Sequence, residues 1–355
     1  MLETYSIYIL VLLFSAVFAF CYQNSKSEFS FFFLLIIFLI LWVPAAVRYG
    51  VGTDYYRYIR MVESVRLGYV ATEYGYYIIN FIVMYLNASP QWVMVITSFI
   101  ILLFSFMAIK KENAFFAFYI FVCLFYLPSM SLIRQAIGVA IIAWGVTQYV
   151  DGKKTICFLT IIIASFFHVS MLLMLPVYLV SIMGIRVSLK LALPLLVCSF
   201  ILSNEIINIL NIPFIQQSKY GFYLTSYFIE KPELGSGVGV FIKTFLPACY
   251  LFFAKRLQIS YKKNNILSWL SLAAVGANLI SINIHIFSRV ADVFIFVSFM
   301  VGPYILSGFK SKVIKQSFVL FVIILLTAFY IRTVQVSINN DEGGIGISPY
   351  QTIFQ

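Results

Sequence analysis

Charged side chains are scarce in this chain. Only 10% of its 355 residues are Asp, Glu, Lys or Arg, whereas 62% are hydrophobic. Soluble domains carry about 25% charged residues. Continuous apolar runs also exclude the alternating pattern of a membrane β-barrel, and only helices and closed barrels satisfy the backbone in lipid. The sequence therefore predicts an all-α, polytopic integral membrane protein.

Motifs that bind metals or nucleotides are also absent. The two histidines and five cysteines form no cluster, and there is no HExxH motif. The glycine patterns of a P-loop and of a dinucleotide-binding fold are missing as well. The sequence thus predicts no metal, no cofactor and no nucleotide-using domain.

Apolar runs along the chain predict about 12 transmembrane helices. The candidate spans lie at roughly 5–21, 30–47, 91–109, 114–128, 132–150, 155–167, 169–184, 191–203, 238–253, 266–284, 289–306 and 316–332. One further stretch, roughly 74–87, either spans the membrane or forms a short interfacial or re-entrant helix. Glu73 and several tyrosines open it, a composition typical of the membrane interface. We expect a single integral membrane domain, residues 1–355.

The net charge of +11 is explained by membrane topology. If 74–87 is the short helix, 14 of the 24 basic residues but only three of the 13 acidic ones lie in loops on one face. The positive-inside rule makes that face cytoplasmic. Both chain ends and the polar loops 48–73 and 204–237 then face outward, and a nucleic-acid partner is not expected.

The segment RYGVGTDYYRY, residues 48–58, concentrates polar groups where the chain leaves the membrane. Arg48 and Asp54 place opposite charges in a region where water is scarce and charged groups usually have a function. Alternatively, Asp54 serves only to hold Arg48 in place. Tyrosines such as Tyr55 and Tyr58 can stack on sugar faces and bond to hydroxyls.

A second polar pair, Arg134 and Gln135, follows Pro128, which we expect to end the preceding helix. The planar arginine fork suits phosphate or carboxylate, and glutamine adds a donor. The alternative is an arginine that snorkels at a helix end.

His168 interrupts an apolar stretch of roughly 27 residues, too long for one helix. We therefore predict a helix–turn–helix with His168 at the outer face. There it exchanges a proton with a sugar hydroxyl or phosphate, or simply bonds to a backbone carbonyl.

Arg289 and Asp292 stand three residues apart, on one face of a predicted helix. They form either an internal salt bridge or an anion-binding arginine that Asp292 orients.

These motifs, in this order, resemble the EpsG family of exopolysaccharide proteins, which belongs with the Wzy-type polymerases of O-antigen and capsule assembly. The resemblance lies in residues 48–58, 133–137 and 167–170, in Arg289, and in the closing Pro349–Tyr350. It spans nearly the whole chain. The glycine-rich tail before Pro349 is either disordered or folds back so that Tyr350 covers a cavity.

The resemblance implies an enzyme that joins undecaprenyl-diphosphate-linked oligosaccharide units on the outer side of the bacterial cytoplasmic membrane. It also implies a multi-helix fold similar to the C type of glycosyltransferase, without a metal. Membrane lipid, the flippase and the chain-length regulator of the same pathway are the expected partners.

On this hypothesis the substrate-binding residues are Arg289, Arg134, Arg48, Gln135, Tyr55, Tyr58 and Tyr350. The arginines neutralise the departing diphosphate. Asp54, His168 and Asp292 are candidates for the catalytic group that accepts the proton of the attacking hydroxyl.

Two other functions fit the composition. A non-enzymatic transporter of lipid-linked glycan would line mid-membrane helices with its arginines. An outer-face glycan ligase or acyltransferase would usually carry a larger outer loop than 204–237.

Overall fold

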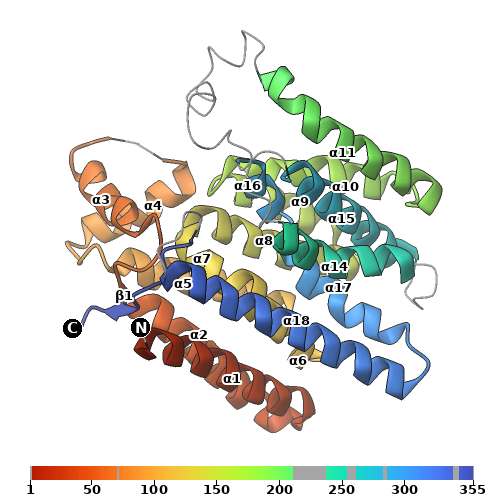
Figure 1. The fold of residues 1–355 in the computed structure, drawn as a ribbon. Coiled ribbons are helices and arrows are strands. Elements are labelled where there is room, and N and C mark those ends of the chain that lie inside the picture. Colours follow the sequence, from red (N-terminus) through yellow and green to blue (C-terminus); the bar gives the residue numbers. More distant parts are fainter. Residues whose placement is uncertain are drawn as a thin grey trace. The chain divides into compact units, whose positions relative to one another are not determined.

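The computed structural model describes residues 2–69, 72–210, 237–253, 261–282, 286–338 and 344–354. Within these ranges the chain is helical almost throughout, with one two-stranded sheet (Figure 1). This confirms the prediction of an all-α membrane protein. Residues 211–236 of the predicted loop 204–237 lie outside the described ranges.

The chain divides into two compact units. The first comprises Met1–Leu175 and Ser311–Gln355, and the second comprises Pro176–Lys310. The first unit therefore contains both chain ends.

The first unit is built from helices that precede and follow the second unit in sequence. Its elements are α1 (Leu2–Asn24), α2 (Ser27–Val47), β1 (Arg48–Tyr49), α3 (Tyr55–Arg66), α4 (Tyr74–Tyr85), α5 (Trp92–Ala108), α6 (Ala114–Phe121), the π-helix η1 (Val122–Tyr126), α7 (Leu127–Ser131), α8 (Ile133–Val150), α9 (Lys154–Ser165), the 3-10 helix η2 (Val169–Leu173), α18 (Lys312–Ile338) and β2 (Gln351–Thr352).

Helix α8 forms the centre of the first unit. Fifteen of its 18 residues are buried, and it packs against both α5 and α9. At Gly145 a Cβ atom would lie 1.9 Å from the Thr160 hydroxyl oxygen, so glycine is what lets α9 approach this closely. The burial of α8 fixes the position of its first turn, which carries Arg134.

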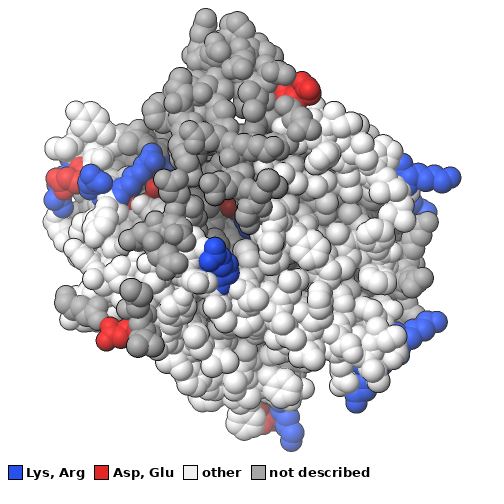
Figure 2. Space-filling view, viewed as in Figure 1, with Lys and Arg blue, Asp and Glu red and all other residues white. Residues whose placement is uncertain are grey.

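Four helices in the described part of the chain are long and apolar enough to cross a membrane. They are Glu3–Asn24, Ser27–Val47, Ala114–Ser131 and Lys312–Ile338. Seven further apolar helices lie at other expected spans, but each is shorter than these four. The count of twelve therefore stays a prediction. Charged side chains are few on the face shown in Figure 2, as expected of a surface in contact with lipid.

Helix α4 corresponds to the ambiguous stretch 74–87. Its 12 residues reach about 18 Å, whereas the hydrocarbon core of a bilayer is about 30 Å thick. The length favours the short interfacial or re-entrant helix over a complete span.

The predicted helix break at Pro128 is displaced by three residues. The helical chain continues through α7 and ends at Ser131. Pro128 is tolerated because it lies in the first turn of α7, directly after η1, where its missing N–H costs little helical hydrogen bonding. Leu132 then has non-helical dihedral angles (φ −100°, ψ 53°), and α8 begins after it.

The second unit contains α10 (Met174–Ile182, which begins two residues before it), α11 (Leu189–Leu210), α14 (Gly237–Phe253), α15 (Tyr261–Ile280), α16 (Ile286–Asp292) and α17 (Phe296–Ser307). Helix α15 contacts α11, α14, α16 and α17. The predicted continuous span 289–306 is wrong in one respect: it is interrupted at residues 293–295. Backbone bonds there run from residue i to i−3, as from Phe294 to Ala291, and they tighten the chain into a turn.

Candidate active site

The segment 48–58 is clamped by the C-terminal residues 344–354, which we call the strap. Strand β1 pairs antiparallel with β2, with Arg48 opposite Thr352, and the N–H of Gly52 donates to the carbonyl of Gly346 at 2.7 Å. The Ser131 hydroxyl donates to the carbonyl of Ile345. Of the two alternatives for the tail, disordered or folded back, the strap has the folded-back one.

Tyr350 anchors the strap to the N-terminal helices. Its N–H donates to the Thr4 hydroxyl oxygen at 3.1 Å, and its own hydroxyl donates to the Pro44 carbonyl at 2.9 Å. Its ring also meets Tyr8 edge-on, with centroids 5.7 Å apart. Tyr350 thus holds the strap in place through contacts with other residues of the same chain.

Arg48 lies in the interior of the first unit, with only 2% of its surface exposed. Its Nη2 lies 3.3 Å from the Met94 sulfur, and its Nε is buried without a hydrogen-bond partner among the described residues. No ion pair joins Arg48 to Asp54, although the structure describes both. The idea that Asp54 holds Arg48 in place is therefore not supported.

The segment 48–58 presents some tyrosines outward and buries others. Tyr55 is buried and donates to Gln91 Oε1 at 2.6 Å, and Tyr58 is buried beside the ring of Tyr76. Tyr49 and Tyr56, in contrast, are about half exposed. The exposed pair is therefore better placed to meet a sugar than the two tyrosines that the sequence singled out. Gln135 is likewise buried.

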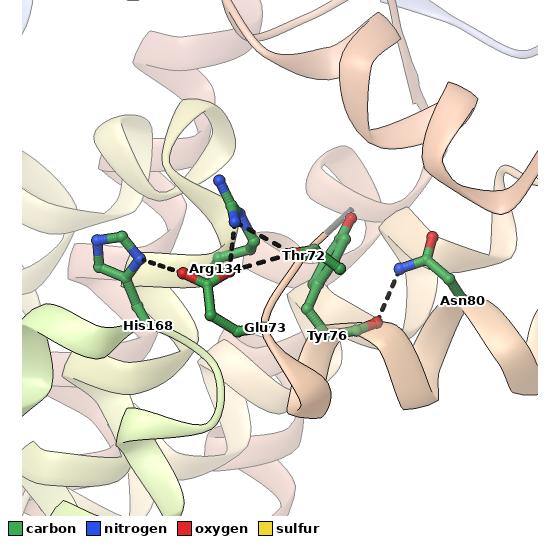
Figure 3. A network of polar contacts seen from close by, with 6 residues as sticks. All are labelled: Thr72, Glu73, Tyr76, Asn80, Arg134 and His168. Atoms are coloured by element: carbon green, nitrogen blue, oxygen red, sulfur yellow. Dashed lines mark hydrogen bonds and ion pairs between the residues drawn. The ribbon is translucent and has the colours of Figure 1, made fainter. Parts of the chain in front are cut away.

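The main polar cluster of the first unit joins Glu73, Arg134 and His168 (Figure 3). The Arg134 guanidinium donates through Nη1 to Glu73 Oε2, and it also donates to the Thr72 hydroxyl at 3.1 Å. The other carboxylate oxygen, Oε1, lies 3.3 Å from Nδ1 of His168. Two of the residues predicted for the site thus meet on Glu73, which the sequence assigned to the membrane interface and not to the site.

Three separate elements bring this cluster together. Arg134 stands in the first turn of α8, Glu73 directly precedes α4, and His168 follows α9 in the turn that the sequence predicts. The N–H of Gly75 donates to the Phe166 carbonyl at 2.8 Å, and a Cβ at residue 75 would lie 2.9 Å from that oxygen. Glycine therefore permits the start of α4 to pack directly on the His168 turn.

The electrostatics of the cluster keep Glu73 ionised. Burial alone would raise its pKa, but the hydrogen bond with His168 and the charge of Arg134 outweigh it and lower the pKa to about 2. The N-terminal turn of α8 adds a partial positive charge, which also favours anions. The cluster thus provides a cation for an anionic ligand and an imidazole for proton transfer.

The second unit has a polar cluster of its own. Asp292 accepts from Lys243 of α14, with Nζ 2.7 Å from Oδ1, and both side chains are mostly buried. Arg289 is half-buried in the same helix as Asp292, and the nearby His285 lies outside the described residues. The sequence does not pair Lys243 with Asp292, because 49 residues separate them along the chain.

Glu73 could have been found from one local signal. It is an acid at the start of an apolar stretch, and a charged side chain at that depth needs a partner. The sequence does not show which partner, because Arg134 and His168 lie 61 and 95 residues further along the chain.

The fold and the cluster define a polytopic helical membrane protein with a cation, an imidazole and a carboxylate at one site. Comparison with family models shows that the chain belongs to the EpsG family, whose model matches residues 31–352. EpsG is a Wzy-type polysaccharide polymerase family, so the chain has a glycosyltransferase-like polymerase role on a lipid-linked oligosaccharide. No curated protein and no solved structure matches it.

Proposed function

We propose that this protein joins undecaprenyl-diphosphate-linked oligosaccharide repeat units into a surface polysaccharide. The observation that supports this proposal is the meeting of Arg134 and His168 on Glu73, with a guanidinium for the diphosphate next to an imidazole for the proton. Family membership supplies the reaction class, and the cluster supplies residues able to perform it.

In the proposed reaction, a hydroxyl oxygen of the incoming unit forms a bond to the anomeric carbon of the growing glycan. The bond between that carbon and the diphosphate oxygen breaks, and the diphosphate leaves with the electron pair. The hydroxyl proton passes to His168. Arg134 stabilises the negative charge on the leaving group, a role that metal ions fill in other enzymes.

We assign proton acceptance to His168 and not to Asp54 or Asp292. A base needs an orienting partner, and Glu73 supplies one at Nδ1, which leaves Nε2 of the same ring to accept a proton. Asp292 is paired with Lys243. Arg48 is too buried to reach a diphosphate, so we assign it a structural role at the start of the segment 48–58.

We place the reaction on the outer side of the bacterial cytoplasmic membrane. The support is the uneven distribution of lysine and arginine among the predicted loops, which leaves the site on the face opposite the basic loops. We further propose that no metal takes part, because the Arg134 guanidinium supplies positive charge for the leaving group.

The direct test uses purified protein in liposomes that contain lipid-linked repeat units. We expect chain growth without nucleotide sugar and in the presence of EDTA. Arg134→Ala should lower the rate about a hundredfold, from a loss of roughly 2–4 kcal/mol of transition-state stabilisation. Arg66→Ala is the matched control, because Arg66 is exposed and pairs with the nearby Glu63. Normal chain growth by Arg134→Ala protein would overturn the site assignment.

A deletion strain separates the polymerase from a transporter. Loss of a polymerase leaves single repeat units on the final acceptor, whereas loss of a transporter leaves no surface glycan at all. Single capped units are the expected result.

A further inference from the structure

The Glu73 carboxylate bonds to both groups that the proposed reaction needs. Oε2 accepts from Arg134, while Oε1 lies 3.3 Å from Nδ1 of His168. Two anions that compete for one guanidinium repel each other, and the repulsion is stronger in a partly buried site than in water. A diphosphate that binds Arg134 therefore competes with Glu73 for the guanidinium.

We propose that Glu73 is a positioning residue that changes partners when the donor binds. Before binding, it neutralises Arg134. Once the diphosphate has displaced it, Glu73 bonds to His168 alone and orients the imidazole for proton transfer. This inference rests on the proposed function, because it takes a diphosphate as the ligand of Arg134.

The hydrogen bonding of Arg134 supports an exchange of anions. Its side chain is only 20% exposed, so an unpaired guanidinium there would be unfavourable, and Glu73 and Thr72 relieve this. However, Nε of Arg134 is buried and has no hydrogen-bond partner among the described residues. Tyr58 is a further hydrogen-bond partner of the Arg134 side chain. Buried donors are normally bonded, so Glu73, Thr72 and Tyr58 still leave Nε for another acceptor.

The geometry at His168 supports the second half of the exchange. A carboxylate at Nδ1 fixes the ring and stabilises the imidazolium that forms when Nε2 accepts a proton. While Glu73 also holds Arg134, its two oxygens are divided between two partners. Release from Arg134 frees the whole carboxylate for His168.

A purely structural role for the Glu73–Arg134 ion pair and a competing role for Glu73 predict opposite changes in diphosphate affinity when Glu73 is substituted. If Glu73 only holds the fold together, removing its charge disorders Arg134 and weakens diphosphate binding. If Glu73 competes with the diphosphate, removing its charge strengthens binding. The sign of the change in Kd therefore separates the two roles.

The experiment measures binding of undecaprenyl diphosphate to the full-length protein in phosphatidylcholine nanodiscs. Glu73→Gln keeps the shape of the side chain and removes its charge. We expect Kd to fall about tenfold, a typical coupling between two ligands of one group. With lipid-linked repeat units, kcat should fall about a hundredfold because His168 loses its anion. Undecaprenol, which has no phosphate, should bind equally to both proteins.

Two further variants isolate the competition. In an Arg134→Gln background, Glu73→Gln should give no gain in affinity, because the contested cation is gone. Thr72→Val removes the hydroxyl that bonds to both Arg134 and Glu73, so it should strengthen diphosphate binding a few-fold. The Thr72 variant also carries the test if Glu73→Gln protein does not fold. Glu63→Gln, an exposed acid paired with Arg66, is the control and should change neither Kd nor kcat.

Unchanged or weaker diphosphate binding in Glu73→Gln and Thr72→Val would overturn the proposal. So would an equal gain for undecaprenol. The proposed function fails separately, if wild-type protein does not lengthen lipid-linked units, because the ratio of the Kd values does not depend on turnover.

Discussion

The N–H of Gly52 donates a hydrogen bond of 2.7 Å to the carbonyl of Gly346, so that a loop near the start of the chain is held by its end. Both glycines have positive φ, and each stands where a side chain would collide with backbone. A Cβ at residue 346 would lie 2.8 Å from the nitrogen of Thr53. The two glycines therefore permit backbone segments from both ends of the chain to touch.

Gly52→Ala is expected to destabilise the protein. Gly52 has φ +103°, and an added Cβ would lie 2.5 Å from the Met130 carbonyl oxygen. The unfavourable dihedral costs about 1–2 kcal/mol and the overlap about 1–3 kcal/mol more. Thermal unfolding of the purified protein in nanodiscs measures the sum.

Gly68→Ala is the matched control for the dihedral angle alone. Gly68 has φ +82°, but an added Cβ would meet nothing within 4 Å. It should therefore lower the midpoint of unfolding less than Gly52→Ala does. Equal losses for the two variants would contradict the contact between Gly52 and Met130.

The strap gives a second prediction. Tyr350→Phe removes the hydroxyl that donates to the Pro44 carbonyl and should cost about 1 kcal/mol. Tyr350→Ala also removes the edge contact with Tyr8 and should cost about 3–5 kcal/mol. Phe354→Ala, at a residue that is 80% exposed, should change stability by less than about 0.5 kcal/mol. Unfolding curves for the three variants would contradict the anchoring role of Tyr350 if they coincide.

Much of this fold can be predicted from the sequence, because apolar runs report directly on helices in lipid. The turn at His168 follows from length alone, since its apolar stretch exceeds one span. The interruption at 293–295 does not, because Val293 and Ile295 continue the apolar pattern and only the backbone bonds reveal the turn. The π-helix η1 is hidden for the same reason.

Two of the three members of the candidate site are predictable from the sequence, but their pairing through Glu73 is not. The sequence identifies Arg134 and His168 as polar residues in apolar surroundings, which is unusual enough to indicate function. It does not show that both bond to Glu73, because the three residues are joined only by tertiary packing. It also places Arg48 at the site by its charge, whereas the structure buries that side chain next to Met94.

The depressed pKa of Glu73 predicts how stability depends on pH. The pKa is about 2 in the folded protein and 4.5 ordinarily, so the unfolded chain binds the proton more readily. Glu73 therefore stabilises the fold fully above pH 4.5, and this contribution is lost as the pH falls through about 2. The difference in unfolding midpoint between wild type and Glu73→Gln should be constant from pH 7 to about 5 and shrink below that.

A difference that already shrinks between pH 7 and 6 would contradict this behaviour. It would mean that the carboxyl is not held by Arg134 and His168 as the structure has it. The Glu63→Gln control, at an exposed pair, should show a smaller and more salt-sensitive effect.

The last prediction distinguishes two candidate bases, His168, which is paired with Glu73, and Asp292, which is paired with Lys243. His168→Gln removes the proton acceptor, so kcat should fall about 10²–10⁴-fold while the unfolding midpoint changes little. Asp292→Asn leaves Lys243 without its anion, so it should lower the unfolding midpoint and leave kcat of the folded fraction nearly unchanged. Adding Lys243→Met to Asp292→Asn removes the unpaired charge and should recover part of the lost stability. Folded protein is quantified by size-exclusion chromatography, and chain growth is measured per folded molecule. If Asp292→Asn instead lowers kcat strongly at an unchanged midpoint, Asp292 takes part in the reaction and the assignment to His168 is wrong.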